Sequence, residues 1–440
     1  MLKRLLYFII TGLLSTVNHA ADKNILFGTY SNHQGSRGIY LLRNDANDHW
    51  TSVYEVDGFP KGIGDYINFS QAVCSGKNCI SVGSFSTTDA THPILMTSQT
   101  AESDWSQVRY ITGISTKVNF LEGHLNHTSC YSHHCFATGL LKDTAGNDNI
   151  IPLIKSEDSG RSWFVSRIQL SKNSAREEMH DLACIQNYCI VSTGNQVANH
   201  FMISDDYGKS WRLNTFTLPH LRIKALQAVG LNFIAVGYYK NDKEMTPVML
   251  VSQNFGRSFS IKPNAVFPNT TTTGFYNTLF CKKHSCLAAG ESGVYPFLSL
   301  SNDDGNTWKT ITPASPFPKG FVAAKIKHVN CTTHSCAALG DYHTGGRLLP
   351  LILTVQLTAS PLVYQITSTM LNNSIKLRDI NCSDAVCYIA GMGEMADDRF
   401  NRPMLFKSDR LLTSWHDISD KAHFPKVDNV WIEKMTMLND

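Results

Sequence analysis

The most regular set of reactive side chains in this sequence is its twelve cysteines. They form six pairs, and four residues separate the two members of every pair. A loop of this length between antiparallel strands places its flanking positions opposite each other, close enough for a disulfide. We therefore expect oxidation within single hairpins: Cys74 with Cys79, Cys130 with Cys135, Cys184 with Cys189, Cys281 with Cys286, Cys331 with Cys336, and Cys382 with Cys387.

Metal binding is the alternative use of these side chains. His134, His284 and His334 lie beside cysteines in three of the loops. The pairs nevertheless stand far apart along the chain, one in each repeat, so no two of them need to meet in a tetrahedral zinc site. We expect neither a metal nor a cofactor, and we interpret these histidines as exposed loop residues.

A repeated phrase surrounds each cysteine pair. A short apolar strand leads to the first cysteine, and an alternating strand that ends near a glycine follows the second. This pattern predicts a β-hairpin. Residues 226–238 have the same pattern, with Val229 and Ile234 in place of the cysteines, and predict a further hairpin without a disulfide.

A second phrase, Ser-x-Asp-x-Gly-x-Ser/Thr-Trp, follows the hairpins at residues 156–163, 204–211 and 301–308, and residues 252–259 are a copy with Asn254 and Phe259 in place of the Asp and Trp. Its Asp can cap the N–H groups of a turn, its Gly supplies a positive φ, and its aromatic residue packs into the next sheet. Degenerate copies end at Trp50, Trp105 and Trp415. The predicted structural residues are Asp158, Gly160, Trp163, Asp206, Gly208, Trp211, Asn254, Gly256, Phe259, Asp303, Gly305, Trp308 and Trp415.

This phrase resembles the Asp box, or BNR repeat, of sialidase-like β-propellers. The resemblance covers most of the chain after its first residues. It implies that each box lies between the third and fourth strands of a blade, on the outside of the propeller and away from the ligand site. Such repeats occur in proteins of several functions, so the resemblance concerns the fold rather than an activity.

The fold class predicted is all-β, a β-propeller of four-stranded blades. The composition agrees, because it is 42% hydrophobic, only 17% charged, and rich in β-branched and aromatic residues. The last segment, which begins at Phe424, matches only the first strand of a blade, whereas the N-terminal segments match strands two to four. We expect the C-terminal strand to close the ring by pairing into the N-terminal blade. This gives eight blades, with seven as the alternative because residues 351–364 have lost the box.

The chain begins with a short basic start, an apolar run and small residues, so we expect residues 1–21 to be a signal peptide and residues 22–440 to form a single propeller domain. Export to the periplasm or the extracellular space agrees with paired cysteines. No later apolar run is long enough for an integral membrane segment. The formal charge is +3, and removal of Lys3 and Arg4 leaves +1, which gives no reason to expect nucleic acid as a partner. We expect a monomer.

A ligand site is expected at the end of the ring opposite the cysteine hairpins. In a four-stranded blade the first and third turns share one end, so the variable loops between strands two and three gather at the other. They also contain Lys240, Asp242, Asp397 and Asp398. The predicted ligand-binding rim is Tyr238, Tyr239, Glu291, Tyr295, Asp341, Tyr342, His343, Arg347, Glu394, Arg399 and Arg402.

Two functions remain open. A sialidase needs an arginine triad, a Tyr/Glu nucleophile pair and an acidic Asp, and the early Phe/Tyr-Arg-Ile-Pro signature is missing, so we assign no catalytic residue. Our hypothesis is an exported, non-enzymatic binding or scaffold protein for a protein or glycan. The alternative is a sialidase-like glycoside hydrolase or lyase at the mouth of the central channel, with rim carboxylates such as Glu291 and Asp341. An enzyme should show perturbed carboxylates beside aromatic platforms in one pocket.

Overall fold

A computed structural model describes most of the chain after residue 23. The described residues are 24–32, 35–43, 49–53, 66–87, 90–100, 104–114, 118, 121–143, 149–166, 178–194, 199–214, 218, 220–240, 244–262, 273–359, 363–367, 375–394, 401–422, 424 and 429–437. The expected signal peptide at residues 1–21 lies outside them. No described helix has the length and apolarity needed to span a bilayer.

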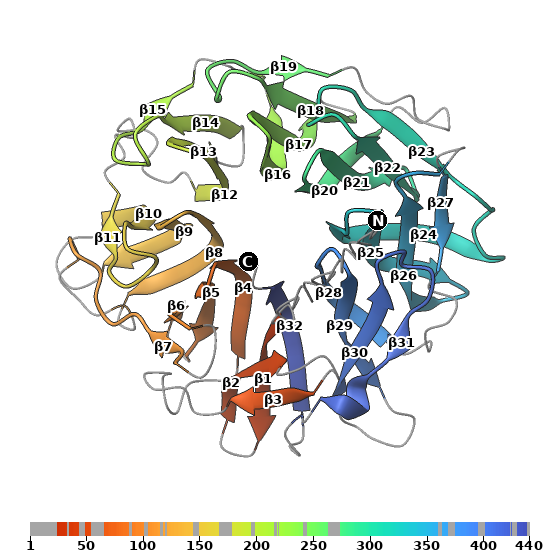
Figure 1. Cartoon of the computed structure of the whole chain (residues 1–440), viewed down its shortest axis with the longest axis horizontal. Coiled ribbons are helices and arrows are strands. Elements are labelled where there is room, and N and C mark those ends of the chain that lie inside the picture. The colour runs from red at the N-terminus through yellow and green to blue at the C-terminus, as the bar shows by residue number, and fades with distance from the viewer. Residues whose placement is uncertain are drawn as a thin grey trace, which may run out of the picture.

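Eight four-stranded antiparallel blades follow one another around a ring (Figure 1). From the axis outwards, blade one contains β32 (Asn429–Met437), β1 (Asn24–Asn32), β2 (Gly35–Arg43) and β3 (Trp50–Val53). Blade two contains β4 (Tyr66–Ser75), β5 (Asn78–Ser86), β6 (Thr91–Ser98) and β7 (Ser106–Gln107). Blade three contains β8 (Glu122–Tyr131), β9 (His134–Asp143), β10 (Asn149–Ser156) and β11 (Phe164–Val165). Blade four contains β12 (Glu178–Ile185), β13 (Tyr188–Gly194), β14 (Asn199–Ser204) and β15 (Arg212–Leu213).

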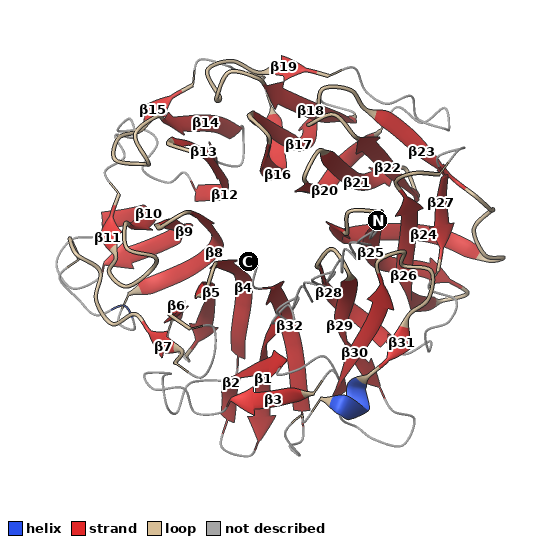
Figure 2. Ribbon diagram, in the orientation of Figure 1, coloured by secondary structure: helices blue, strands red, loops and turns tan. Residues whose placement is uncertain are grey.

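The other half of the ring has the same construction. Blade five contains β16 (Leu221–Val229), β17 (Asn232–Lys240), β18 (Met245–Ser252) and β19 (Ser260–Ile261). Blade six contains β20 (Gly274–Lys282), β21 (Ser285–Ser292), β22 (Tyr295–Ser301) and β23 (Lys309–Pro313). Blade seven contains β24 (Phe321–Cys331), β25 (Ser335–Thr344), β26 (Arg347–Gln356) and β27 (Val363–Ile366). Blade eight contains β28 (Ile375–Cys382), β29 (Val386–Glu394), β30 (Asn401–Asp409) and β31 (His416–Asp417), and a 3-10 turn follows at Ser419–Lys421 (Figure 2).

The ring closes as the sequence predicts. β32 pairs antiparallel with β1 from Asn24 opposite Met437 to Ser31 opposite Asn429, so both ends of the chain contribute to blade one. The described fold is therefore the all-β propeller, with eight blades rather than seven.

All six predicted disulfides are present, each within one hairpin and with Cα atoms 4.0–4.1 Å apart. The prediction for blade five was wrong by one residue. Ala228 lies opposite Phe233, in the register of the cysteines, whereas Val229 pairs with Asn232 and Ile234 with Gln227. The two-residue turn at residues 230–231 fixes this register. This register could not be read from the sequence, because the hairpin has no cysteines and apolar residues stand at neighbouring positions.

The Ser-Asp-Gly-Trp turns (residues 156–163, 204–211, 252–259 and 301–308) connect the third and fourth strands of their blades. In the first of them, the N–H and the hydroxyl of Ser162 donate to Asp158 at 2.8 and 2.6 Å. Gly160 has φ +87°, and its N–H donates to the Ser156 hydroxyl at 2.8 Å. The motif is thus a turn that satisfies its own polar groups.

The core consists of eight apolar clusters, one between each pair of adjacent blades. The aromatic residue of each turn packs against the preceding blade rather than the next one: Trp163 of blade three lies with Ile80 and Leu95 of blade two. Sequence alone could not decide this, because a neighbouring sheet lies on either side. In blade seven, which lacks the Ser-Asp-Gly-Trp turn, Tyr364 on β27 joins the cluster with blade six.

Every innermost strand contains a β-bulge, and the extra residue comes four positions before the first cysteine or its counterpart. The glycine that follows most hairpins accommodates this bulge. At Gly237 and Gly340 an added Cβ would lie 1.8 Å from a carbonyl oxygen of the bulged strand. The repeat therefore needs glycine there for space, and each bulge turns a side chain away from the regular ladder.

Candidate ligand-binding face

The two ends of the ring have the different roles expected from the strand order. At the stapled end, which comprises the cysteine hairpins and the Ser-Asp-Gly-Trp turns, the two kinds of turn contact each other. The N–H of Ser159 donates to the carbonyl of His133 at 2.8 Å, and the N–H of Asp304 donates to that of His284 at 3.0 Å. The turns between the second and third strands lie at the loop end, opposite the stapled end.

An aromatic cluster at the loop end brings two of the predicted rim residues together. Tyr295, at the start of β22, stacks on Phe321 with ring centroids 5.4 Å apart. Phe321 also lies 4.4 Å from Phe317 and 6.2 Å from Tyr342 on β25. Tyr295 remains 42% exposed, whereas Tyr342 is only 8% exposed. The exposed face of this cluster is therefore provided mainly by blade six and by the segment that connects it to blade seven.

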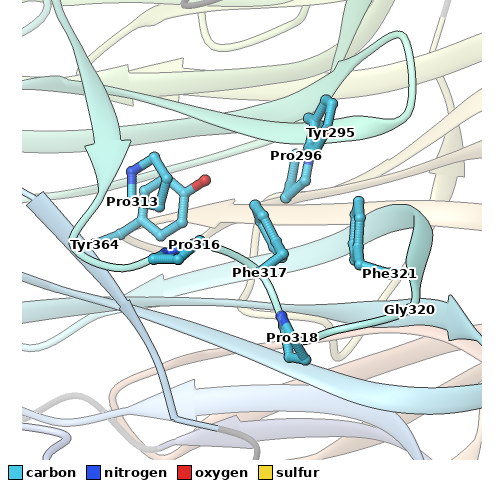
Figure 3. A pocket seen from close by; sticks show the side chains of 9 residues that line it. All are labelled: Tyr295, Pro296, Pro313, Pro316, Phe317, Pro318, Gly320, Phe321 and Tyr364. Atoms are coloured by element: carbon cyan, nitrogen blue, oxygen red, sulfur yellow. The ribbon is translucent and has the colours of Figure 1, made fainter.

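A pocket of about 450 Å³ lies beside this cluster, between blades six and seven (Figure 3). Its lining residues are aromatic side chains, prolines and one glycine. The volume falls within the range usual for small-molecule sites. None of its nine described lining residues carries a carboxylate: Tyr295, Pro296, Pro313, Pro316, Phe317, Pro318, Gly320, Phe321 and Tyr364.

The missing turn of blade seven explains why the pocket forms at this interface. β23 and β27 pair in parallel, with Thr312 opposite Val363 and Pro313 opposite Tyr364, which joins the two blades into one sheet. Tyr364 pairs with Val355 and is 2% exposed. Its ring thus forms a buried wall of the pocket in place of a turn tryptophan.

Some of the other predicted rim residues are buried or half-buried, and others are exposed at the surface. Tyr238 on β17 is half-buried and lies edge-on to Phe275 of blade six at 5.8 Å. Asp341 is buried and bonds to Lys327. The remaining residues are half-buried Tyr239 and exposed Lys240, His343, Arg347 and Arg402. The side chains of Glu394, Asp242, Asp397, Asp398 and Arg399 lie outside the described residues.

Glu291 has a structural role between blades six and seven. It is 8% exposed, and its Oε1 accepts hydrogen bonds from Asn277 Nδ2 at 2.7 Å and from the N–H of Ile326 at 3.1 Å. Burial raises its pKa, although these bonds and the charge of Lys325 oppose the rise. Its partners lie in blades six and seven, so this carboxylate links adjacent innermost strands.

Asp181 and Glu433 link blades in the same way. Asp181 Oδ2 accepts the N–H of Leu226 in the next blade at 2.8 Å, and Glu433 Oε2 accepts the N–H of Phe69 at 2.5 Å. Burial raises the pKa of both carboxyls, that of Glu433 to about 7. The structure therefore contains perturbed carboxylates. Asp181 and Glu433 stand on innermost strands and Glu291 on β21, and none of the three lines the aromatic pocket.

Sequence reasoning missed most of the pocket. Phe317 belongs to a Phe-Pro phrase that also occurs before other hairpins, at Phe59, Phe267 and Phe424, and is therefore typical of the repeat. Phe321 and Tyr364 have the appearance of ordinary strand residues. The available signal was the concentration of proline and phenylalanine at residues 313–321, next to blade seven, which lacks the Ser-Asp-Gly-Trp turn.

Comparison with known proteins shows the fold alone. No family model and no curated protein matches the chain. A GH74 xyloglucanase from Xanthomonas campestris aligns with TM-score 0.48 and 12% identity over 89% of this chain and 68% of that one. A prolyl endopeptidase aligns with TM-score 0.50 and 12% identity over 86% of this chain, which spans 50% of that protein's length.

Proposed function

We propose that the protein is an exported, non-enzymatic binding module that engages a glycan or protein ligand through its loop end. The observation that carries this proposal is the aromatic and proline-lined pocket between blades six and seven, which has no carboxylate in its described lining. Exposed aromatic rings on a rigid scaffold contribute large contact area at little cost in conformational entropy. Membership of the Asp-box propellers and export by a signal peptide belong to this proposal. The four Ser-Asp-Gly-Trp turns and the six disulfides support them.

Catalysis is the second candidate, because three carboxyls that link adjacent blades, Asp181, Glu291 and Glu433, have raised pKa values. Each of them already accepts at least one backbone N–H from the adjacent blade. Glu291 and Asp341, the pair considered for a hydrolase, have separate partners in Asn277 and Lys327. These contacts give the carboxylates a structural role and favour the binding proposal.

The test uses residues 22–440 produced in an oxidising compartment, screened on a glycan array with fluorogenic glycosides alongside. We expect glycan binding without turnover. Tyr295→Ala should weaken binding roughly tenfold, since one aromatic contact contributes about 1 kcal/mol beyond the area it buries. Tyr110→Ala is the matched control, because Tyr110 is 64% exposed and does not line the pocket.

Two results would change the proposal. Turnover that disappears in Glu291→Gln or Asp341→Asn would establish the glycosidase alternative. Silence in both assays would exclude the glycans presented and direct the search to a protein ligand, for which the same Tyr295 and Tyr110 variants apply.

A further inference from the structure

The bulges of the innermost strands place polar side chains around the axis of the ring. At each bulge one residue falls between two paired positions of the ladder, where the backbone redirects its side chain. Every one of these residues is polar, although the position before each of them is apolar. They are Ser70, Asn126, His180, Lys224, Asn277, Lys327, Arg378 and Glu433.

Positive charge concentrates on one arc of these strands. In blades five, seven and eight the bulge residue is a cation, and a second cation stands two positions before it. In blade one, Lys434 follows the bulge residue. The exposed members are Lys224, Lys325, Lys376 and Arg378. The whole set is Arg222 and Lys224 on β16, Lys325 and Lys327 on β24, Lys376 and Arg378 on β28, and Lys434 on β32.

The carboxylates on these strands are already engaged in holding the blades together. Asp379 accepts the N–H of Ile380 at 3.0 Å and the N–H of Met435 in the next blade at 2.9 Å. Glu433 accepts the N–H of Phe69. Bonds of this kind satisfy the oxygens of a carboxylate with backbone donors. Lys327 also pairs with Asp341 on β25. The seven cations of the arc nevertheless outnumber Asp379 and Glu433, the carboxylates on the same strands, together with Asp341.

The side chains of different blades lie within electrostatic range of one another around the axis. Burial lowers the pKa of His328 on β24 to about 4, and the charge of Lys434 on β32 adds to this effect. Burial and Lys434 also lower the pKa of His127 on β8. These histidines stand two blades from Lys434 in opposite directions around the ring, so its ammonium group acts on both sides of the axis.

We propose that this cationic arc is an anion-binding site that takes a tetrahedral oxyanion, phosphate or sulfate, either free or carried as an ester on a larger ligand. The site is independent of the aromatic pocket and of the function proposed for it. Lysine supplies five of the seven cations of the arc. Ammonium groups act as point charges suited to compact oxyanions, whereas recognition of a carboxylate favours the planar fork of arginine.

The test measures binding of inorganic sulfate and phosphate to the oxidised protein by isothermal titration calorimetry at low ionic strength. We expect saturable binding that Lys325→Gln combined with Arg378→Gln weakens about tenfold or more, because hydrogen bonds between ionised groups are stronger than those between neutral groups. The matched control combines Lys209→Gln with Arg257→Gln. These two exposed cations belong to Ser-Asp-Gly-Trp turns at the stapled end, and their removal changes the net charge equally.

Arg378→Lys keeps the positive charge while changing the side chain. It therefore distinguishes loss of binding through loss of charge from loss of binding through a folding defect. It should bind sulfate within about threefold of the parent protein, since a point charge suffices at this site. Equal weakening in the two double variants, no saturable binding by the parent, or acetate binding as tight as sulfate would overturn the proposal. Heparin serves as a sulfated polymer: binding much tighter than that of free sulfate would assign the oxyanion to an ester on a larger ligand.

Discussion

The carboxylates at the stapled end and those that link adjacent blades near the axis respond to burial in opposite ways. At Asp158, Asp206 and Asp303, burial would raise the pKa, but hydrogen bonds from nearby hydroxyl and N–H groups outweigh it and lower the pKa. At Asp181, Glu291 and Glu433, burial outweighs the hydrogen bonds and the pKa rises. The first set completes local turns, whereas the second joins separate blades at a cost in desolvation.

This difference distinguishes the part of the ring that provides stability from the parts that contain the candidate binding sites. The stapled end repeats the same turn with the same partners in several blades, so its residues serve the stability of the ring. The innermost strands and the loop end change from blade to blade, and they contain the cationic arc and the aromatic pocket. Substitutions at the stapled end should therefore alter stability, and those elsewhere should alter binding.

The largest effect is expected at a turn tryptophan. Trp163 is 1% exposed, and its indole N–H donates to the carbonyl of Gly160 at 3.0 Å. Trp163→Ala should lower the free energy of unfolding by about 3–5 kcal/mol, because it leaves a cavity between blades two and three. Urea unfolding measures this change. Tyr110→Ala, at a 64% exposed position, should stay within about 0.5 kcal/mol. If the two variants lost the same free energy of unfolding, Trp163 would have no special role in the stability of the ring.

The next effect is a pH dependence that depends on Glu433. Its pKa is about 7 in the folded protein against an ordinary value of 4.5, although Arg378, Lys434 and the N–H of Phe69 oppose the rise. Between these pH values the folded state holds the proton of Glu433 more tightly than the unfolded state does, so the contribution of Glu433 to the free energy of unfolding falls as the pH rises from about 4.5 to 7. The lowered pKa values of His127 and His328 oppose this fall. The fall is at most about 3 kcal/mol. Glu433→Gln should abolish it.

Asp303→Asn supplies the contrast for this measurement. Because its folded pKa is lowered, Asp303 stabilises the protein above its ordinary pKa, and this contribution is lost only as the pH falls further. Unfolding curves between pH 5 and 8 should keep the parent slope in Asp303→Asn. In Glu433→Gln the slope should shift towards an increase with pH, because the opposing contributions of His127 and His328 remain. A parent slope in both variants would place the titrating group elsewhere.

Removal of one disulfide should have a smaller effect. Cys184→Ala with Cys189→Ala opens a short loop, for which the chain-entropy estimate is about 2 kcal/mol. Blade five has Ala228 and Phe233 in the same register and still forms its hairpin. The variant should therefore fold and unfold at a lower urea midpoint. Loss of the folded state altogether would mean that the disulfides do more than stabilise hairpins that form without them.

The sequence predicted those features that local residue types encode. The cysteine spacing and the Ser-Asp-Gly-Trp phrase each specify a turn, and the split first blade specifies closure. The cationic arc could not be predicted from the sequence. A bulge shifts the register between residues such as Ile326 and His328, and this breaks the alternation of side chains along the strand. The pocket was missed because Phe317 belongs to a repeated Phe-Pro phrase, and its partners come together only when blades six and seven pack.

The smallest effect on stability is expected at the loop end, where an exposed and a buried tyrosine line the same pocket and can be compared directly. Tyr295 and Tyr364 line the same pocket, but they are 42% and 2% exposed. Tyr295→Ala loses mainly its stacking on Phe321, so the free energy of unfolding should fall by no more than about 1 kcal/mol. Tyr364→Ala should cost several times more in the same urea titration, because its ring fills the interface where a turn tryptophan packs in other blades. If Tyr295→Ala destabilised the protein as much as Tyr364→Ala, its ring would be part of the scaffold, and the loop end would lose its exposed anchor for a ligand.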